Sequence, residues 1–285
     1  MLLHVLPSDA FGLLPALVLV GCSALGSAYV LAARSVNHAH PRSPVPRWRI
    51  VAFLSGVVAL MLALASPLDE WADQLLTAHM LQHILLAMVV PVLLALGAPV
   101  TLVLRAAPRG ARNRLILPLL HSRAVQLVTH PYVGWVLFSV VMWEAHFSPL
   151  YNAALEDESL HALEHLAFLV TGCLFWWPVV GADPMPRRLG YGRRMAFVLL
   201  QMPISAAVGL VLYFAPAVLY AHYATVEGPL GIDPLVDQQV AGLVMWGVGD
   251  LLMLGAVTYV VASWMQADAR RSQRRAPAPT DQRIV

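Results

Sequence analysis

Seven long apolar stretches divide this chain into membrane-length segments and constrain its fold more than any other feature. An α-helix needs about 20 apolar residues to cross the hydrocarbon core of a bilayer. The expected helices cover residues 11–33, 49–66, 74–104, 132–148, 161–181, 195–220 and 239–264. The sequence has no series of alternating ten-residue segments, which a transmembrane β-barrel requires. We therefore expect an all-α membrane protein, a bundle of about seven transmembrane helices.

Charged residues are unequally distributed among the connections, and this predicts the orientation of the bundle. All 18 basic residues are arginines, and they gather in alternate connections and in the C-terminal tail. The intervening connections carry acidic residues such as Asp69, Glu156, Glu227 and Asp233, without an arginine. By the positive-inside rule the N-terminus is expected outside and the C-terminus in the cytoplasm. The net charge of +2 hides this asymmetry and does not indicate nucleic-acid binding.

The organisation expected from the sequence is one helical bundle over residues 1–265 and a disordered, basic cytoplasmic tail over residues 266–285. The long connection between residues 105 and 131 is expected to hold an amphipathic helix on the cytoplasmic side. Pro91 and Pro99 predict a tilt or kink in the third helix. The two cysteines, Cys22 and Cys173, fall inside expected helices and indicate packing rather than a disulfide.

Two pairs of histidines suggest a site inside the outer half of the bundle. His79 and His83 are four residues apart, as are His161 and His165, so each pair shares one face of its helix. Imidazole is a common ligand of transition metals and is costly to place in hydrocarbon without a partner. The second pair, with Glu164, also matches the H-x-x-E-H pattern of inverted zincins. Since no further acidic zinc ligand is evident, a metal site shared by the two pairs is the favoured interpretation.

Other side chains are candidates for the same site. His146, His161 and His222 are expected at its outer rim, where the alternative for His146 and His222 is an interfacial residue without a ligand role. Interhelical hydrogen bonding without metal is the alternative for the histidines together. Met80 and Met142 are possible soft ligands, which would favour Cu(I) over zinc. The remaining candidates are acidic groups expected to orient a ligand or carry protons: Glu144, Glu164 and Asp250. Trp71, Trp143, Tyr151, Tyr220 and Tyr223 are expected in an aromatic belt at the membrane surface.

An ordered set of motifs resembles one known family. The motifs are His79-Met80-x-Gln82-His83, Trp143-x-x-His146, His161-x-x-x-His165 followed by Phe175-Trp176-Trp177-Pro178, and Asp237-Gln238-Gln239-x-Ala241-Gly242-x-x-Met245-Trp246. Together they resemble the CtaG-like assembly factors of caa3-type cytochrome c oxidase over about residues 50–265. The resemblance implies a multi-pass protein of the bacterial inner membrane that is needed to make an active haem–copper oxidase. It also implies five ligand candidates, His79, His83, His146, His161 and His165, whereas His222 is proposed from its expected depth alone.

The resulting expectation is a non-enzymatic assembly factor, a metallochaperone that binds copper as Cu(I) and delivers it to the oxidase. Its expected partners are subunits of a haem–copper oxidase, the lipid bilayer and a periplasmic copper donor. Three alternatives stay open. A haem-binding oxidoreductase would use facing histidines such as His79 and His165, a metalloprotease would hold zinc, and a structural scaffold would use the histidines as a hydrogen-bonded network.

Overall fold

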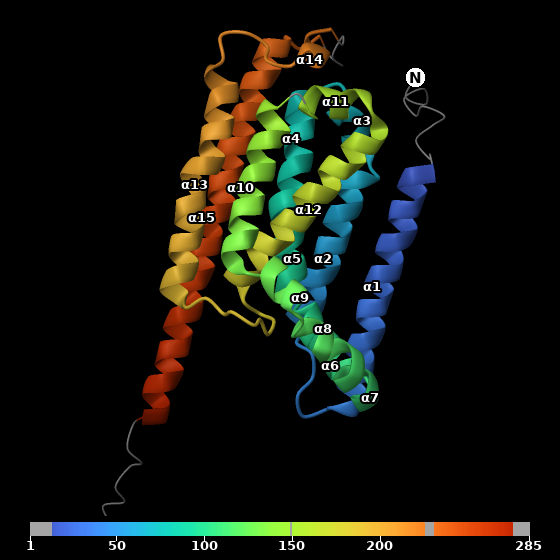
Figure 1. Cartoon of the computed structure of the whole chain (residues 1–285), viewed down its shortest axis with the longest axis vertical. Helices are drawn as coiled ribbons and strands as arrows, with labels where there is room; N and C mark the ends of the chain where they lie inside the picture. Colours follow the sequence, from blue (N-terminus) through green and yellow to red (C-terminus); the bar gives the residue numbers. More distant parts are fainter. Residues whose placement is uncertain (1–12, 149, 226–230, 276–285) are drawn as a thin grey trace, which may run out of the picture.

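The computed structural model describes residues 13–148, 150–225 and 231–275, which are helical with short connections and contain no strand (Figure 1). The all-α class is therefore confirmed for these residues. The helices that run along the bundle are α1 (Leu13–Ala39), α2 (Arg47–Leu64), α4 (Leu76–Ile84), the π-helix η1 (Leu85–Val89), α5 (Val90–Leu96), α6 (Pro99–Ala106), α10 (Pro131–Phe147), α12 (Glu158–Val180), α13 (Tyr191–Phe214) and α15 (Pro234–Arg275). The shorter helices are α3 (Pro67–Ala72), α7 (Arg109–Ala111), η2 (Arg112–Ile116), α8 (Leu117–Leu120), α9 (Arg123–Val128), α11 (Leu150–Glu156) and α14 (Ala221–Thr225).

Six helical runs of the described chain are long and apolar enough to cross a membrane. They are α1, α2, the run Leu76–Ala106, α12, α13 and α15. The remaining expected crossing corresponds to α10, which has 17 residues and packs against α12 and α13. A multi-pass helical membrane protein is thus supported, whereas the count of seven stays a prediction. The last helix continues beyond the expected boundary at residue 265, and residues 276–285 of the expected tail lie outside the described residues.

The two ends of the bundle differ in charge. The acidic helix α3 lies with α11 and α14 at one end, and the segment from α7 to α9, which carries four arginines in α7, η2 and α9, lies at the other (Figure 1). In the connection between residues 105 and 131, the expected single helix is instead a helical run from Arg109 to Leu120 followed by α9. Glu227 lies outside the described residues. Which end faces the cytoplasm stays a prediction from the positive-inside rule.

The third span is interrupted twice, as its prolines predict. A π-helix precedes Pro91, and the helix ends at Leu96 and restarts at Pro99 after Ala98, whose φ is 50°. Proline has no N–H, so the carbonyl of Ala87 lacks its usual donor four residues later. The Trp176 indole N–H supplies it, with a distance of 2.9 Å from Nε1 to the Ala87 oxygen. Helix α12 is therefore joined to the third span just below His83.

A glycine allows this junction to be close. A Cβ atom at Gly172 of α12 would lie 2.5 Å from the Ala87 carbonyl oxygen and 2.9 Å from Pro91 Cγ. Small residues let helix backbones approach in this way inside membranes, where dispersion and hydrogen bonds replace the hydrophobic effect. Only glycine leaves the room that the observed contact needs. The close approach brings the α12 histidines against those of α4.

Two aspartates from distant parts of the chain cap the starts of two helices of the third span, α4 and α6. The Asp237 carboxylate accepts hydrogen bonds from the Leu76 N–H (2.6 Å) and the Thr77 hydroxyl (2.6 Å) at the start of α4. The Asp183 carboxylate does the same at the start of α6, from the Thr101 N–H and hydroxyl, both at 2.7 Å. A carboxylate at a helix N-terminus satisfies free N–H groups and interacts favourably with the helix dipole. These acids fix the position of the span that carries His79 and His83.

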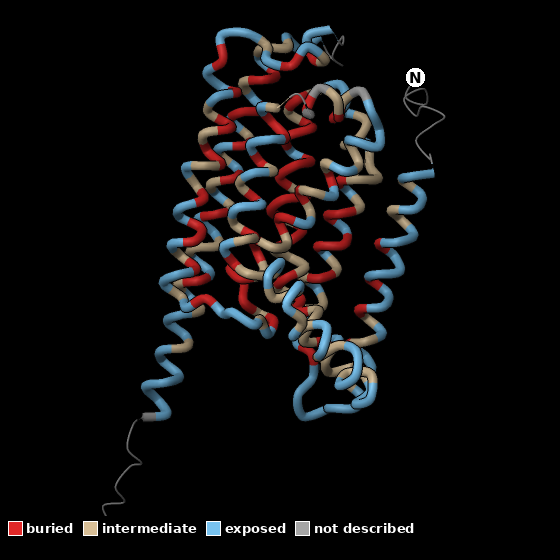
Figure 2. Tube along the Cα trace, viewed as in Figure 1, coloured by how far each residue is buried: buried red, intermediate tan, exposed pale blue. Residues whose placement is uncertain are grey.

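Burial shows which helices form the centre of the bundle. Half of the membrane-length window is buried in the third span and in α12, but only 22% in α1. Buried residues gather along the inner helices, whereas α1 diverges from the bundle toward the acidic end and is largely exposed there (Figure 2). The helices with the paired histidines are therefore central, and α1 is peripheral.

Candidate metal centre

Five histidines meet at the acidic end of the bundle, and we call them the histidine cluster: His79, His83, His146, His161 and His165. Helix α4 contributes the first two, α10 the third and α12 the last two. Within the pairs, the ring centroids are 4.3 Å apart for His79 and His83, and 4.2 Å for His161 and His165. Between the helices, the rings of His79 and His161 are 5.3 Å apart. The sequence thus predicted the two faces, and the structure places them against each other.

His146 lies deeper than its sequence position suggested. Its ring centroid is 5.6 Å from that of His83, and the side chain is 2% exposed. The expectation that His146 lines an outer rim is therefore wrong, because α10 inclines this residue toward α4. The ring centroid of His83 is also 6.2 Å from that of His165. His83 of α4 therefore lies between His146 of α10 and His165 of α12.

Glu164 belongs to the cluster itself. Its Oε1 atom is 4.0 Å from His83 Nε2, and the side chain is 9% exposed. One ligand atom each from His79, His161 and Glu164 lie within 4.8 Å of one another, which is the spacing of a metal-binding group. A carboxylate oxygen and two imidazoles form a common donor set for divalent and borderline metals. The structure therefore places Glu164 among the possible metal ligands, whereas the sequence predicted that it orients a ligand.

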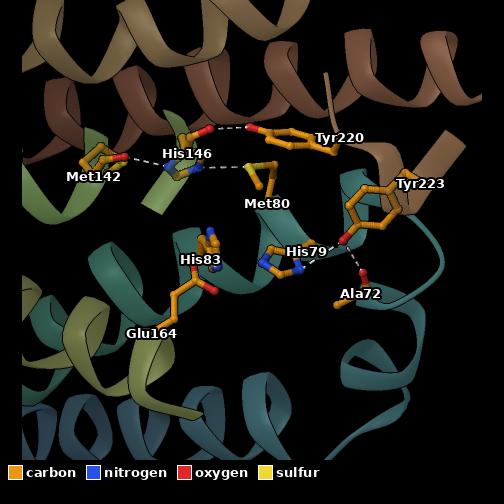
Figure 3. A network of polar contacts seen from close by, with 9 residues as sticks. All are labelled: Ala72, His79, Met80, His83, Met142, His146, Glu164, Tyr220 and Tyr223. Carbon is orange, nitrogen blue, oxygen red and sulfur yellow. Dashed lines mark hydrogen bonds and ion pairs between the residues drawn. The ribbon is translucent and has the colours of Figure 1, made fainter. Parts of the chain in front are cut away.

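The hydrogen bonds of His79 indicate which of its nitrogens is free. The Tyr223 hydroxyl donates to the Ala72 carbonyl oxygen at 2.7 Å and lies 3.2 Å from His79 Nδ1 (Figure 3). A hydroxyl has one hydrogen, so Nδ1–H of His79 is the donor to the Tyr223 oxygen. This assignment comes from the hydrogen-bond network. The lone pair of neutral His79 is then on Nε2, inside the cluster, where a metal ligand needs it.

His146 is oriented in the same way. Its Nδ1–H donates to the Met142 carbonyl oxygen at 2.6 Å, and its Nε2 is 3.3 Å from Met80 Sδ (Figure 3). A carbonyl oxygen only accepts, so the lone pair is again on Nε2. His146 and Met80 therefore present a nitrogen and a soft sulfur side by side. Met142 contributes to this arrangement through its backbone.

Several buried polar atoms of the cluster have no hydrogen-bond partner among the described residues. They are His79 Nε2, both ring nitrogens of His83, His161 Nε2, His165 Nε2 and both carboxyl oxygens of Glu164. Nearly all buried polar atoms in proteins are hydrogen-bonded, and an unpaired one costs about 1–3 kcal/mol. Seven such atoms in one place do not suit a structural network, because that network would pair them with one another. Their chemistry fits a cluster whose partner is a metal ion.

Three tyrosines close the cluster toward the acidic end of the bundle, and we call them the tyrosine cap: Tyr151, Tyr220 and Tyr223. They are 1%, 4% and 4% exposed, which contradicts the expected place of these residues in an aromatic belt. The Tyr151 ring lies 5.4 Å from that of His79 and 6.3 Å from that of His146. Burial raises the pKa of all three hydroxyls, so they stay neutral. Trp71 and Trp143 are exposed, as a belt position requires.

The other predicted site residues lie apart from the cluster. Among the described residues, His222 forms no hydrogen bond or ring contact with the five histidines. Its Nε2 is 2.9 Å from the Asp73 carbonyl oxygen. Glu144 is exposed rather than buried and faces a cleft between α10 and α12. Asp250 is half-buried in α15, next to Gly249, which packs against Met88 five residues beyond His83. At 1.5 Å per residue along the helix, Met88 and therefore Gly249 lie about 7.5 Å from His83, away from the acidic end of the bundle.

Two residues that position the cluster were not recognised as such from the sequence. Gln82 Nε2 donates to the Ala63 carbonyl oxygen at 2.7 Å and to Asp69 Oδ1 at 2.6 Å, which ties α4 to α2 and α3. Burial raises the pKa of Asp69, and the hydrogen bond from Gln82 opposes this shift. The available signal was a glutamine between two histidines in an apolar helix, because an amide there needs partners.

Comparisons with known proteins agree with the motifs. The family model described as cytochrome c oxidase caa3 assembly factor matches residues 27–267. Uncharacterized proteins of Mycobacterium bovis and Mycobacterium tuberculosis are each 33% identical over 237 residues, which cover 80% of this chain and 36% of the relative. An uncharacterized protein of Mycobacterium leprae is 31% identical over 265 residues, covering 90% and 40%. The chain thus spans about 40% of the length of these relatives or less. No solved structure matches it.

Proposed function

Because the chain belongs to the family of cytochrome c oxidase caa3 assembly factors, we propose that it binds copper in the histidine cluster and delivers it to a haem–copper oxidase. An assembly role of this kind requires binding and release but no turnover. The proposed location is the bacterial inner membrane, with the acidic end of the bundle outside and oxidase subunits as partners. A periplasmic copper donor is the proposed source of the metal.

One observation carries this proposal: the unpartnered nitrogens and carboxyl oxygens of the cluster converge from α4 and α12 in the interior of a membrane protein. Polar side chains at such depth mark functional sites in membrane proteins. The Tyr223 and Met142 contacts fix the tautomers of His79 and His146 so that both present Nε2. Such oriented imidazoles are typical of metal ligands, whose other nitrogen is held by a hydrogen bond.

The surroundings of the cluster favour a small, soft ion. Met80 Sδ beside His146 Nε2 adds a thioether, a ligand that selects Cu(I) over zinc. A haem would have to lie between α4 and α12, yet α12 meets the third span directly at Gly172 and Ala87. A protease that uses Glu164 as general base needs access for a peptide, whereas this carboxylate is 9% exposed and lies against His83. Copper binding is the proposal that agrees with the thioether beside His146, the close approach of α12 to the third span and the burial of Glu164.

The cleft between α10 and α12 that Glu144 faces suggests how the metal leaves toward a membrane partner. It has a volume of about 200 Å³, lies between α10 and α12, and is lined by Leu160, Leu163, Glu144 and Glu164. Glu164 therefore borders both this cleft and the histidine cluster. The exposed leucines Leu160 and Leu163 give the cleft a lipid-facing mouth. Transfer by ligand exchange through Glu164 to an oxidase subunit docked there is the proposed delivery step.

Copper binding is tested directly by metal analysis of the purified protein. After anaerobic loading with Cu(I) and removal of excess metal, we expect about one copper per chain and no absorbance from haem. The matched measurement uses His222→Ala, which leaves the cluster intact and should hold the same amount of copper. A protein that retains no copper under these conditions, or that is isolated with a Soret band, would contradict the proposal.

Exchanging the sulfur ligand tests the oxidation state. Met80→Leu keeps a buried side chain of similar volume at a position that is 0% exposed but removes the thioether. We expect the affinity for Cu(I) to fall about tenfold, equivalent to about 1.4 kcal/mol, and the affinity for Zn²⁺ to stay unchanged. Competition titrations against a chromogenic chelator measure both affinities. Equal losses for the two metals would show that Met80 acts through packing.

A further inference from the structure

A cleft that is lined by apolar and titratable residues lies beside the histidine cluster on the side of α1. Its volume is about 470 Å³, and its walls are the outer part of α1, the region of α3 and the first turns of α12. The apolar part of the wall includes Leu14 and Val18 of α1, where this helix diverges from the bundle (Figure 1). The titratable residues that line it are Asp69, Asp73, Glu158, His161 and His165. No arginine is among the described residues that line it.

This cleft reaches the cluster itself. His165 lines it, yet its side chain is 7% exposed and its Nε2 has no hydrogen-bond partner among the described residues. His161 also lines the cleft, and its ring is 5.3 Å from that of His79. An ion that enters the cleft therefore meets α12 histidines first and can pass to α4 histidines by exchanging one ligand at a time.

The direct route from the end of the bundle is closed. The tyrosine cap lies over His79 and His146, and Tyr151 and Tyr220 are in ring contact at 4.2 Å. Tyr223 further ties the cap to α3 through its bond to the Ala72 carbonyl oxygen. Entry from above would require these buried rings to move. A path from the side instead reaches the cluster through the cleft that His161 and His165 line.

From this geometry we propose that the cleft between α1, α3 and α12 is the loading port through which a metal cation reaches the histidine cluster. The proposal rests on the proposed function for the identity of the cation, which is Cu(I). Asp73 and Glu158 are exposed acids of the port, whereas Asp69 is held by Gln82 at its inner wall. Acids of one sign that line a cleft with low-dielectric walls concentrate cations and accelerate their entry. His161 and His165 are the first ligands.

Charge-selective thiol labelling tests the port without copper. In a chain with Cys22→Ala and Cys173→Ala, Ala162→Cys places a single thiol in the cleft. We expect a cationic methanethiosulfonate to modify it about tenfold faster than an anionic one, and Asp73→Asn/Glu158→Gln to reduce this preference severalfold. Val170→Cys, which faces outward from α12 beyond the cleft, is the control and should react slowly with both reagents. An unreactive Ala162→Cys thiol, or one without charge preference, would overturn the proposal.

The rate of copper loading separates this proposal from the proposed function. With Asp73→Asn/Glu158→Gln we expect about tenfold slower Cu(I) uptake in stopped-flow measurements, at an unchanged final stoichiometry. Asp233→Asn, an exposed acid of the same end of the bundle outside the cleft, should load at the original rate. If the unaltered protein binds no copper, the proposed function fails while labelling still decides whether the cleft admits cations. Unchanged loading together with normal copper content would refute the port alone.

Discussion

Replacing His79 and His83 together with alanine is expected to abolish copper binding and to leave the oxidase without its copper. Both side chains lie at the centre of the cluster, at 0% and 2% exposure. His83 is the residue that contacts the histidines of both α10 and α12. Without this pair the donors from the other helices are separated across the space that the two rings fill. Copper content should fall from about one per chain to a background level.

The same pair of substitutions distinguishes a metal site from a structural scaffold. The side chain of His83 forms no hydrogen bond among the described residues, and the side chain of His79 forms one, with Tyr223. The metal site therefore predicts normal abundance of the variant in membranes, together with oxidase subunits that are present but lack copper. A scaffold predicts that protein abundance and oxidase activity fall together. His38→Ala/His40→Ala, two exposed histidines at the opposite end, is the matched control and should change neither quantity.

The paired histidines were predictable because local geometry determines them. A spacing of four residues places two side chains on one helix face whatever surrounds the helix. Hydrophobicity likewise identified the long helices, since a bilayer requires about 20 apolar residues per crossing. The features that were missed depend on distant neighbours. The position of His146 at a helix end predicted a rim location, whereas its contacts with His83 and Met80 depend on where the packing of α10 against α12 and α13 places its ring.

Long-range pairing also explains why three tyrosines were wrongly placed at the membrane surface. Tyrosine at a helix end is typical of a membrane interface, and only the positions of α11 and α14 over the bundle show that these rings form a cap. Glu144 is exposed and lines the cleft between α10 and α12 together with Glu164. The orienting or proton-carrying roles expected for Glu144 and Asp250 stay predictions. The acids that do organise the fold, Asp183 and Asp237, pair with residues 82 and 160 positions away. No local pattern contains such partners.

Gly172→Val is expected to lower copper affinity by more than tenfold although every candidate ligand is retained. The added Cβ atom would lie 2.5 Å from the Ala87 carbonyl oxygen, a backbone atom that cannot move away alone. Helix α12 must therefore shift away from the third span, which also weakens the bond from Trp176 to the same oxygen. Metal–ligand distances tolerate only about 0.2 Å, so a small displacement of α12 separates His161 and Glu164 from His79. Competition titration with Cu(I) measures the loss.

The control for this substitution is Gly247→Val in α15, where a Cβ atom meets no described heavy atom within 4 Å. Both exchanges remove a helical glycine in favour of a β-branched residue, so intrinsic helix propensity changes equally. If the variants lost copper to the same extent, the effect would come from altered helix stability and not from the spacing of α4 and α12. Retention of full copper affinity in Gly172→Val would show that the histidine pair of a single helix holds the copper. A site assembled between two central helices requires that Gly172→Val loses copper affinity and that Gly247→Val retains it.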